Sequence, residues 1–177
     1  MKSLKDYVMV FENIINNETC KKIIDTYNNG DWQKGYIGNS KESDIRKCYL
    51  KYIDKDFEKD IFKAVGLILK LYGEAHPHFN TGETIEDTGY EHLVYLGAEN
   101  GEYKEHVDHF DLAPRVLSCS FILNDNYDGG DFAFFGAEHI VKKQKGSAVV
   151  FPSNFCFPHA ITPVSNGNRH SIITWIH

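Results

Sequence analysis

The sequence predicts a mainly β protein with packed helices, in which an antiparallel sandwich or barrel is supported by helices near the N-terminus. Two observations lead to this fold class. From Tyr90 onward, short runs of β-branched and aromatic residues alternate with glycine-bearing turns, as at 128–131 and 166–168, which is typical of all-β architectures. Between Lys55 and Tyr72, apolar residues recur at helical spacing instead, so this segment predicts a helix with one core-facing side.

The expected elements follow from these patterns in chain order. The N-terminal part is expected to form a strand at 7–11, a helix from 16–19 through Tyr27, a polar loop at 34–46, a strand at 45–53 and a long helix that Asp54 caps and Gly73 ends. The loop and the strand after it are typical of a hairpin. Six further strands are expected at 92–96, 103–108, 116–123, 132–135, 147–151 and 171–176.

Length and composition favour a single globular domain spanning residues 1–177. The chain has 177 residues, of which 42% are hydrophobic and 25% are charged. A chain of this length and composition can bury a sizeable core. No repeat or low-complexity linker divides it, so residues 1–89 are expected to pack on the β core of 90–177. The net charge of -6 and the lack of a Lys/Arg block disfavour a nucleic-acid partner.

The cysteines and the N-terminal segment bear on location. Cys20, Cys48, Cys119 and Cys156 are widely separated and include no Cys-x-x-Cys pair, so we expect reduced thiols and no structural zinc. The chain also lacks a signal-peptide core or a long apolar span, which predicts a cytoplasmic protein without membrane contact.

The strongest functional signal is the pair His106 and Asp108. Residues two apart in a strand point to the same face, about 6 to 7 Å apart along the chain, which suits two ligands of one metal ion. A nitrogen from another strand would complete two imidazoles and one carboxylate, the set typical of non-haem Fe(II) oxygenases. His159 is the candidate, 159 - 108 = 51 residues beyond Asp108, a gap that allows it to come from the opposite sheet.

Arg169 follows His159 by ten residues, after the turn-rich segment 165–168. If the two segments pair as a hairpin folded near Val164, then His159 and Arg169 lie roughly opposite each other and share a face. The metal would then have a guanidinium near it.

Three groups of residues resemble the 2-oxoglutarate- and Fe(II)-dependent dioxygenases, within them the prolyl 4-hydroxylase-like branch. They are Tyr103-x-x-His106-x-Asp108, the segment Gly129-Gly130-Asp131-Phe132, and the segment from His159 to Val164 with Gly167, Arg169 and Trp175 after it. The ordered set is far more specific than a lone His-x-Asp. The resemblance implies a double-stranded β-helix, a cupin-like jelly roll, whose N-terminal helices support one sheet.

The resemblance also implies roles for individual residues. His106, Asp108 and His159 look like the iron ligands, and Arg169 looks like the partner of the distal carboxylate of 2-oxoglutarate, which its planar fork can bind bidentately. Tyr95 is similar to the family's tyrosine that hydrogen-bonds this cosubstrate. The implied cofactors are Fe(II), 2-oxoglutarate and O2, with ascorbate as an accessory reductant.

One position departs from the branch. Several prolyl hydroxylases supply a tyrosine that shares the distal carboxylate, and the matching position here is Ile122. Ser171, two residues after Arg169 and on the same strand face, is a candidate replacement, because an Arg-x-Ser pair serves this purpose in other branches. Ser118 and Ser120 are weaker candidates.

A second His-x-Asp, at His109 and Asp111, lies three residues further on. We prefer His106 and Asp108, because Tyr103 precedes them by the family spacing and the later pair runs toward a break at 113–114. The loop 34–46 resembles the hairpin that covers the substrate in prolyl hydroxylases, and such a lid would exclude water from the reaction. Trp175 is expected to face the pocket or the core.

The resulting prediction is an oxygenase that couples decarboxylation of 2-oxoglutarate to succinate and CO2 with hydroxylation of a prolyl residue in a protein or peptide. A hydroxylase or demethylase acting on another side chain, a small molecule or a nucleic acid would keep the same metal and cosubstrate residues. A non-catalytic jelly-roll binding module has no need of this set, and a structural zinc site would favour thiolates.

Overall fold

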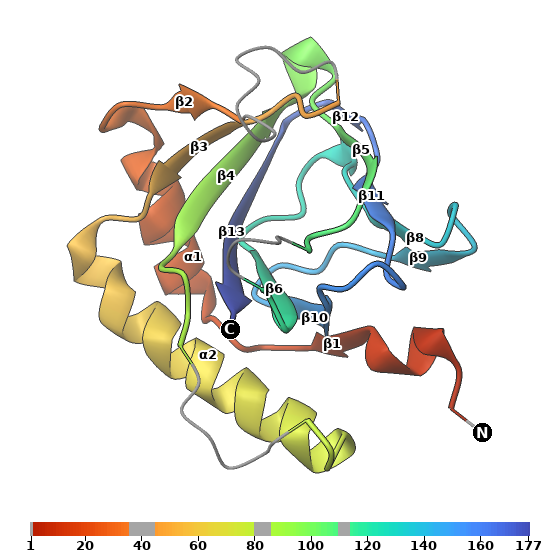
Figure 1. The fold of residues 1–177 in the computed structure, drawn as a ribbon. Helices are drawn as coiled ribbons and strands as arrows, with labels where there is room; N and C mark the ends of the chain where they lie inside the picture. Colours follow the sequence, from red (N-terminus) through yellow and green to blue (C-terminus); the bar gives the residue numbers. More distant parts are fainter. Residues whose placement is uncertain (1, 36–44, 80–85, 110–113) are drawn as a thin grey trace.

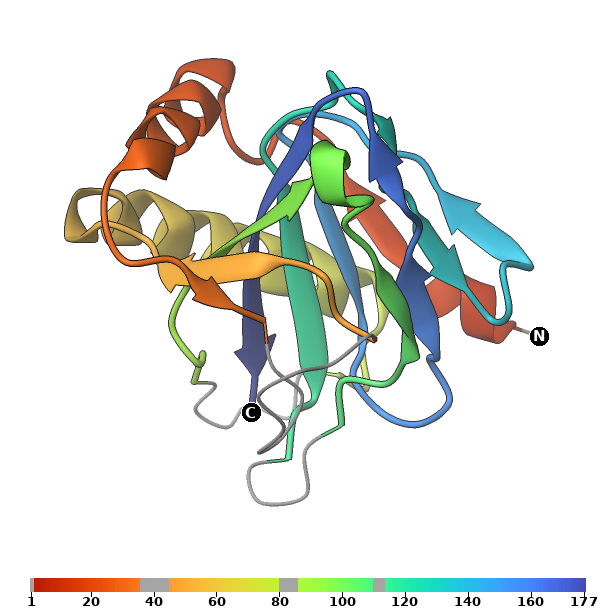
Figure 2. The same cartoon turned by 90° about the horizontal axis from the view of Figure 1, so that it is seen from above.

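The structure, a computed structural model, describes residues 2–35, 45–79, 86–109 and 114–177. Its helices are the two α-helices α1 (Asn17–Asp25) and α2 (Lys55–Ala75) and the short 3-10 helices η1 (Leu4–Tyr7), η2 (Thr26–Asn28) and η3 (Gly97–Glu99). Both α-helices lie on one side of the larger sheet, and a smaller sheet lies on its other side (Figure 1). The view from above in Figure 2 shows α2 running along the larger sheet.

The strands form antiparallel sheets. The seven-stranded sheet has the order β1-β10-β6-β13-β4-β3-β2, the four-stranded sheet has the order β5-β11-β8-β9, and β12 pairs with β7. The strand bounds are β1 Met9–Phe11, β2 Gln33–Lys34, β3 Tyr49–Tyr52, β4 Glu91–Leu96, β5 Tyr103–His106, β6 Leu117–Ile122, β7 Asp128–Gly129, β8 Phe132–Phe134, β9 His139–Val141, β10 Ala148–Pro152, β11 His159–Ile161, β12 Val164–Ser165 and β13 Asn168–Ile176. The predicted jelly roll with helices on one sheet is confirmed.

Alternation along the central strands builds two cores from one sheet. Successive residues of a strand face opposite sides. In β10, Val150 packs with the helices, whereas Val149 and Phe151 pack between the two sheets. In β13, Ile172 and Ile173 divide in the same way. The larger sheet is therefore buried on both faces, and its central strands carry apolar residues on both sides.

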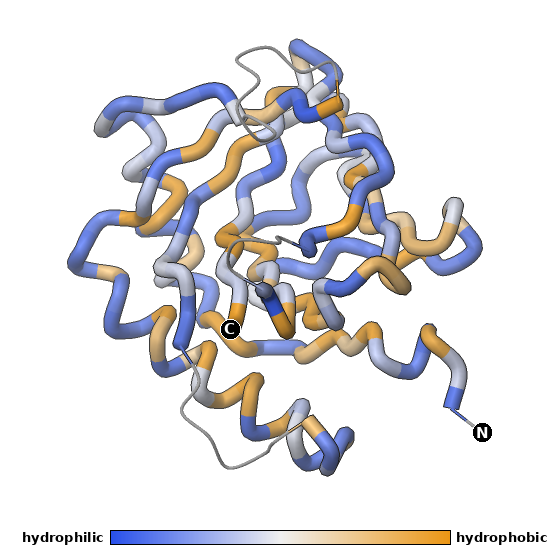
Figure 3. Tube along the Cα trace, viewed as in Figure 1, coloured by the Kyte–Doolittle hydropathy of each residue, from blue (hydrophilic) through white to orange (hydrophobic). Residues whose placement is uncertain are grey.

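The helices begin and end largely where their end signals predict. The side chain of Asn16 accepts a hydrogen bond from the Thr19 backbone N–H, which caps α1. Apolar and polar residues alternate along α2 (Figure 3), and its buried residues include Ile61, Val65 and Ile68. The expectation that Gly73 ends this helix is wrong, because α2 continues to Ala75. Its last turn is held by the packing of the His76 ring against the buried ring of Tyr72, with centroids 4.7 Å apart.

The segments of His159 and Arg169 do not pair as the hairpin that the sequence analysis considered. β11 pairs with β5 and β8 in the smaller sheet, whereas β13 pairs with β4 and β6 in the larger one. The intervening strand β12 pairs with β7 instead of turning back on β11. Gly129 lets the chain pass from the smaller sheet to the larger one at this point. Its φ is +65°, and any other residue would bring a Cβ into collision with the Pro163 carbonyl oxygen.

The predicted loop 34–46 lies mostly outside the described residues. Its flanks form the hairpin that the sequence predicts, with Gln33 opposite Leu50 and Lys34 opposite Tyr49. Within the described ranges, no helix has the length and apolar character needed to cross a membrane.

Candidate metal centre and adjoining pocket

His106, Asp108 and His159 come together between the two sheets. They offer ligand atoms that all lie within 4.8 Å of one another. His106 Nε2 lies 3.5 Å from Asp108 Oδ1, and His159 Nε2 lies 3.7 Å from Asp108 Oδ2. Among the described residues, this is the one group of His, Cys, Asp and Glu side chains that could hold a metal ion.

The two histidines are neighbours in one sheet. His106, the last residue of β5, is the direct partner of His159, the first residue of β11. Directly opposed residues project to the same face, so both rings point toward the larger sheet. The 51-residue gap also allowed His159 to come from the opposite sheet, but the structure places it in the same sheet as His106, where strand register brings the two nitrogens together.

Backbone carbonyls orient both rings. Nδ1 of His106 lies 2.9 Å from the Lys104 carbonyl oxygen, and Nδ1 of His159 lies 3.1 Å from that of Phe157. A carbonyl oxygen only accepts, so each Nδ1 donates its proton and each Nε2 faces the centre, free of the backbone. This is the tautomer that a metal-binding histidine needs.

Asp108 lies two residues beyond the end of β5 and is held from the larger sheet. Its Oδ2 accepts a hydrogen bond of 2.7 Å from Ser118 Oγ, and its backbone carbonyl accepts one of 3.1 Å from Arg115 Nη1. Burial opposes ionisation of this carboxyl, but hydrogen bonding and charge from His106, His159 and Ser118 outweigh it and hold its pKa below the usual value.

The protonation states suit a divalent metal. Burial lowers the pKa of His159 to about 4, despite the opposing charge of Asp108, so this imidazole is neutral at neutral pH while the carboxylate is ionised. Metal ligands must be deprotonated in this way. Two imidazoles and one carboxylate that lie together in this way fit a non-haem iron with coordination positions left open.

Arg169 lies in the same pocket and is almost completely buried, with 1% of its surface exposed. Its Nε donates to the Gly130 carbonyl oxygen at 3.2 Å, and its Nη1 donates to Ser171 Oγ at 2.6 Å. The guanidinium carbon lies 5.1 Å from the ring centroid of Tyr95 and 5.5 Å from that of Phe132. The guanidinium is thus held by aromatic faces and two hydrogen bonds.

Tyr95 and Ser171 flank this arginine. Tyr95 on β4 is buried and is the strand partner of Arg169, and Ser171 is the strand partner of Ile122 on β6. The Ser171 hydroxyl therefore lies directly beside the position where the branch supplies a tyrosine. Of the two weaker candidates, Ser120 lines the pocket and Ser118 contacts Asp108 instead.

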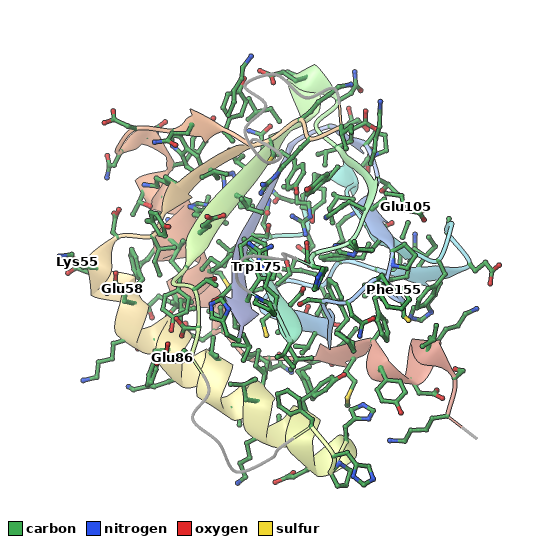
Figure 4. All side chains as sticks on the ribbon, viewed as in Figure 1. Lys55, Glu58, Glu86, Glu105, Phe155 and Trp175 are labelled. Carbon is green, nitrogen blue, oxygen red and sulfur yellow. The ribbon has the colours of Figure 1, made fainter. Side chains whose placement is uncertain are left out.

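Of the remaining residues that the sequence singled out, Trp175 lies at the pocket and His109 does not. Trp175, labelled in Figure 4, lines the pocket from the end of β13, and the guanidinium carbon of Arg115 lies 3.6 Å from its ring centroid. His109 is exposed, and Asp111 lies outside the described residues. The structure therefore brings His106 and Asp108, not His109, to the pocket.

Sequence reasoning missed several contributors. It did not single out Arg115 or Ser153, it considered Ser118 only as a cosubstrate contact, and it treated Arg46 as part of a lid. Arg46 lines the pocket, and its guanidinium carbon lies 5.1 Å from the Tyr103 ring centroid. A usable signal was present for Ser118, because a hydroxyl inside a buried strand needs a hydrogen-bond partner.

Comparison with known proteins agrees with this geometry. Residues 90–177 match the family model of the 2OG-Fe(II) oxygenase superfamily. A PKHD-type hydroxylase from Colwellia psychrerythraea is 27% identical over 110 residues, which cover 57% of this chain and 48% of the relative. One from Alteromonas mediterranea is 34% identical over 92 residues, 45% of this chain and 39% of the relative. The chain thus spans less than half the length of these relatives.

Solved structures share the fold over nearly the whole chain. A prolyl hydroxylase from Trichoplax adhaerens, in complex with a hypoxia inducible factor peptide fragment, has a TM-score of 0.76 at 17% identity, covering 97% of this chain and 83% of its own. A prolyl-4-hydroxylase from Pseudomonas putida has a TM-score of 0.72 at 21% identity, covering 96% and 91%. At these identities the likeness demonstrates the fold.

Proposed function

Since the chain belongs, through residues 90–177, to the 2OG-Fe(II) oxygenase superfamily, we propose that it is a dioxygenase that holds iron with His106, Asp108 and His159. The observation that carries the proposal is one pocket containing a facial set of two oriented imidazoles and one ionised carboxylate, with a buried arginine beside it. The two imidazoles and the carboxylate suit a metal ion with open coordination positions, and the arginine suits an anionic cosubstrate.

Arg169 would bind the distal carboxylate of 2-oxoglutarate. Its fixed guanidinium needs no reordering when the anion arrives, because Gly130 and Ser171 already position it. Ser171 accepts from Arg169 and still has a hydroxyl proton to donate to the carboxylate. Tyr95 supports the guanidinium with its ring face. These three residues supply binding and orientation for the cosubstrate.

When bound, iron, 2-oxoglutarate and O2 would supply the oxidation: one oxygen atom would enter succinate as 2-oxoglutarate releases CO2, and the other would enter a C–H bond of the substrate as a hydroxyl group. The chain's own contribution is to keep water out and to hold the reactants. Phe132, Phe151 and Trp175 line the pocket with apolar surface, which favours a dry reaction centre.

The proposed substrate is a prolyl residue in a protein or peptide. The named relatives are PKHD-type hydroxylases, and solved proteins of the same fold are prolyl hydroxylases, one of them with a bound peptide fragment. Arg46 and Trp175 both line the pocket, and we propose that they contact the substrate peptide.

The test is succinate formation from 2-oxoglutarate in the presence of Fe(II), O2 and a library of proline-containing peptides, with mass spectrometry for one added oxygen atom. His106→Ala should abolish both signals, because it removes a metal ligand, whereas His109→Ala should retain them. An oxygen atom added to a residue other than proline would reassign the substrate. No succinate from the wild-type protein with any peptide would contradict the proposal.

A further inference from the structure

A chain of buried hydroxyls leads from the larger sheet to the candidate metal carboxylate. Ser118 Oγ lies 2.7 Å from Asp108 Oδ2 and 2.8 Å from Ser153 Oγ. Ser118 is fully buried and Ser153 is 1% exposed. Neither serine belongs to the ligand set, and the proposed reaction does not use them.

The direction of these hydrogen bonds follows from their chemistry. An ionised carboxylate only accepts, so Ser118 donates its single hydroxyl proton to Asp108. The Ser118 oxygen is then an acceptor, and the Ser153 hydroxyl donates to it. Ser153 is itself fixed, since its backbone N–H donates to the Val116 carbonyl at 3.1 Å, next to β6. Aligned hydroxyls of this kind polarise one another and strengthen the final bond.

Asp108 needs such support because strand pairing does not hold it. β5 ends at His106, whereas the imidazoles of His106 and His159 are fixed by sheet register and by backbone carbonyls. The side chain of Asp108 is instead fixed by Ser118 from across the barrel. We propose that the pair Ser153 and Ser118 positions Asp108 as a one-oxygen ligand, with Oδ2 taken by the serine and Oδ1 presented to the metal.

This inference rests on the proposed metal site and deepens it. A two-oxygen carboxylate would occupy an additional coordination position, whereas one oxygen leaves three positions open on a six-coordinate ion. The serine pair would thereby preserve room for a chelating cosubstrate and for O2. Ser118 and Ser153 are positioning residues, because they act through Asp108.

The experiment is titration of the metal-free full chain with Co(II) or Mn(II), by calorimetry and by the visible absorption of the Co(II) form. Ser118→Ala should weaken metal binding about 10- to 100-fold, the range for lost partners of metal ligands, and should change the Co(II) spectrum because Oδ2 is released. Ser153→Ala should weaken binding less. The double variant should bind no more weakly than Ser118→Ala, because Ser153 acts through Ser118.

Ser147→Ala is the matched control. Ser147 is also fully buried, and its hydroxyl donates a hydrogen bond of 2.6 Å to the Gln144 carbonyl oxygen. This bond does not involve His106, Asp108 or His159. Loss of the Ser147 hydroxyl should therefore lower stability without changing metal affinity or the Co(II) spectrum. If Ser118→Ala does not fold, Ser153→Ala tests the same pair, and Ser118→Thr, which keeps the hydroxyl, should retain metal affinity.

Two outcomes separate this inference from the proposed function. Unchanged affinity and spectrum in Ser118→Ala would overturn the positioning role while leaving the metal site in place, and where that variant does not fold, unchanged affinity in Ser153→Ala would do the same. If the wild-type chain binds neither Co(II) nor Mn(II), the metal site itself is contradicted, and with it the inference that depends on it.

Discussion

Arg169 illustrates how single residues define the pocket. A buried guanidinium is costly unless its donors and faces are occupied, and here Gly130, Ser171 and two aromatic rings occupy them. Gly130 has a φ of +65°, and a Cβ there would lie 3.1 Å from the Cδ of Arg169. The absence of a side chain at this position therefore lets the arginine approach closely.

Replacing Ser171 tests the cosubstrate role at this scale. Ser171→Ala should raise the apparent requirement for 2-oxoglutarate about tenfold or more, because a hydrogen bond to a charged group contributes roughly 1.5–3 kcal/mol. The measurement is the KM for 2-oxoglutarate in the succinate assay. Thr174→Val is the control, since Thr174 is the strand partner of Cys119 and faces the helices. Equal KM values in wild type and Ser171→Ala would remove Ser171 from the cosubstrate site.

At the scale of elements, the site depends on a crossing between sheets. The chain leaves the smaller sheet after β11, pairs briefly as β12 with β7, and enters the larger sheet as β13. This path places His159 and Arg169 on facing sheets while both line one pocket. Pairing of β12 with β7 at Gly129 therefore sets the position of the candidate metal ligand His159 relative to Arg169.

Gly129→Ala should destabilise the fold more than Gly136→Ala. Both glycines have positive φ, at +65° and +64°, so both substitutions impose left-handed strain of about 1–2 kcal/mol. A Cβ at 129 would also collide with the Pro163 carbonyl oxygen, whereas a Cβ at 136 meets nothing within 4 Å. Urea unfolding of the two variants measures the difference. Equal losses would mean that the close approach at Pro163 is not tightly constrained.

At the scale of the whole molecule, one sheet serves two cores. Its helical face packs against α1 and α2, and its inner face closes the pocket with the smaller sheet. We propose on this basis that residues 1–177 fold and act as one domain. A buried histidine pair lies on the helical side, with His92 Nε2 and His170 Nδ1 3.0 Å apart beneath Trp32 and Tyr27.

This pair should make global stability sensitive to acid. Burial, with the mutual repulsion of the pair and the charge of Lys51, lowers the pKa of His92 to about 3, and burial followed by the charge of Arg169 lowers that of His170 to about 4. Both values lie below about 6.5, the value expected in the unfolded chain. At pH values between the folded-state and unfolded-state pKa values, the unfolded chain therefore binds more protons than the folded one. The free energy of unfolding falls as pH drops from about 6.5 toward 4.

Urea unfolding at several pH values in this window checks the effect. His92→Gln should reduce the slope of stability against pH relative to wild type, because one buried titrating group is lost. His78→Gln, at an exposed position, should leave the slope as it is. If His92→Gln retains the wild-type slope, the acid sensitivity has another origin.

Local sequence patterns were sufficient for most of the elements and for the pair His106 and Asp108, but they did not predict the short strands β7, β9, β11 and β12. Strand alternation, the helix cap at Asn16 and the spacing of His106 and Asp108 depend on residues a few positions apart, so they can be read from the chain. Helix ends depend on tertiary contacts as well: α2 continues past Gly73 to Ala75, where the His76 ring packs against Tyr72.

The tertiary structure decided which distant segments meet. Register made His159 the direct partner of His106 within one sheet, and the crossing at Gly129 sent Arg169 to the facing sheet. Pairing between distant strands depends on the packing of the whole core, so neither outcome follows from local spacing. The same holds for Ser118, whose contact with Asp108 exists only because β6 lies across the barrel from the end of β5.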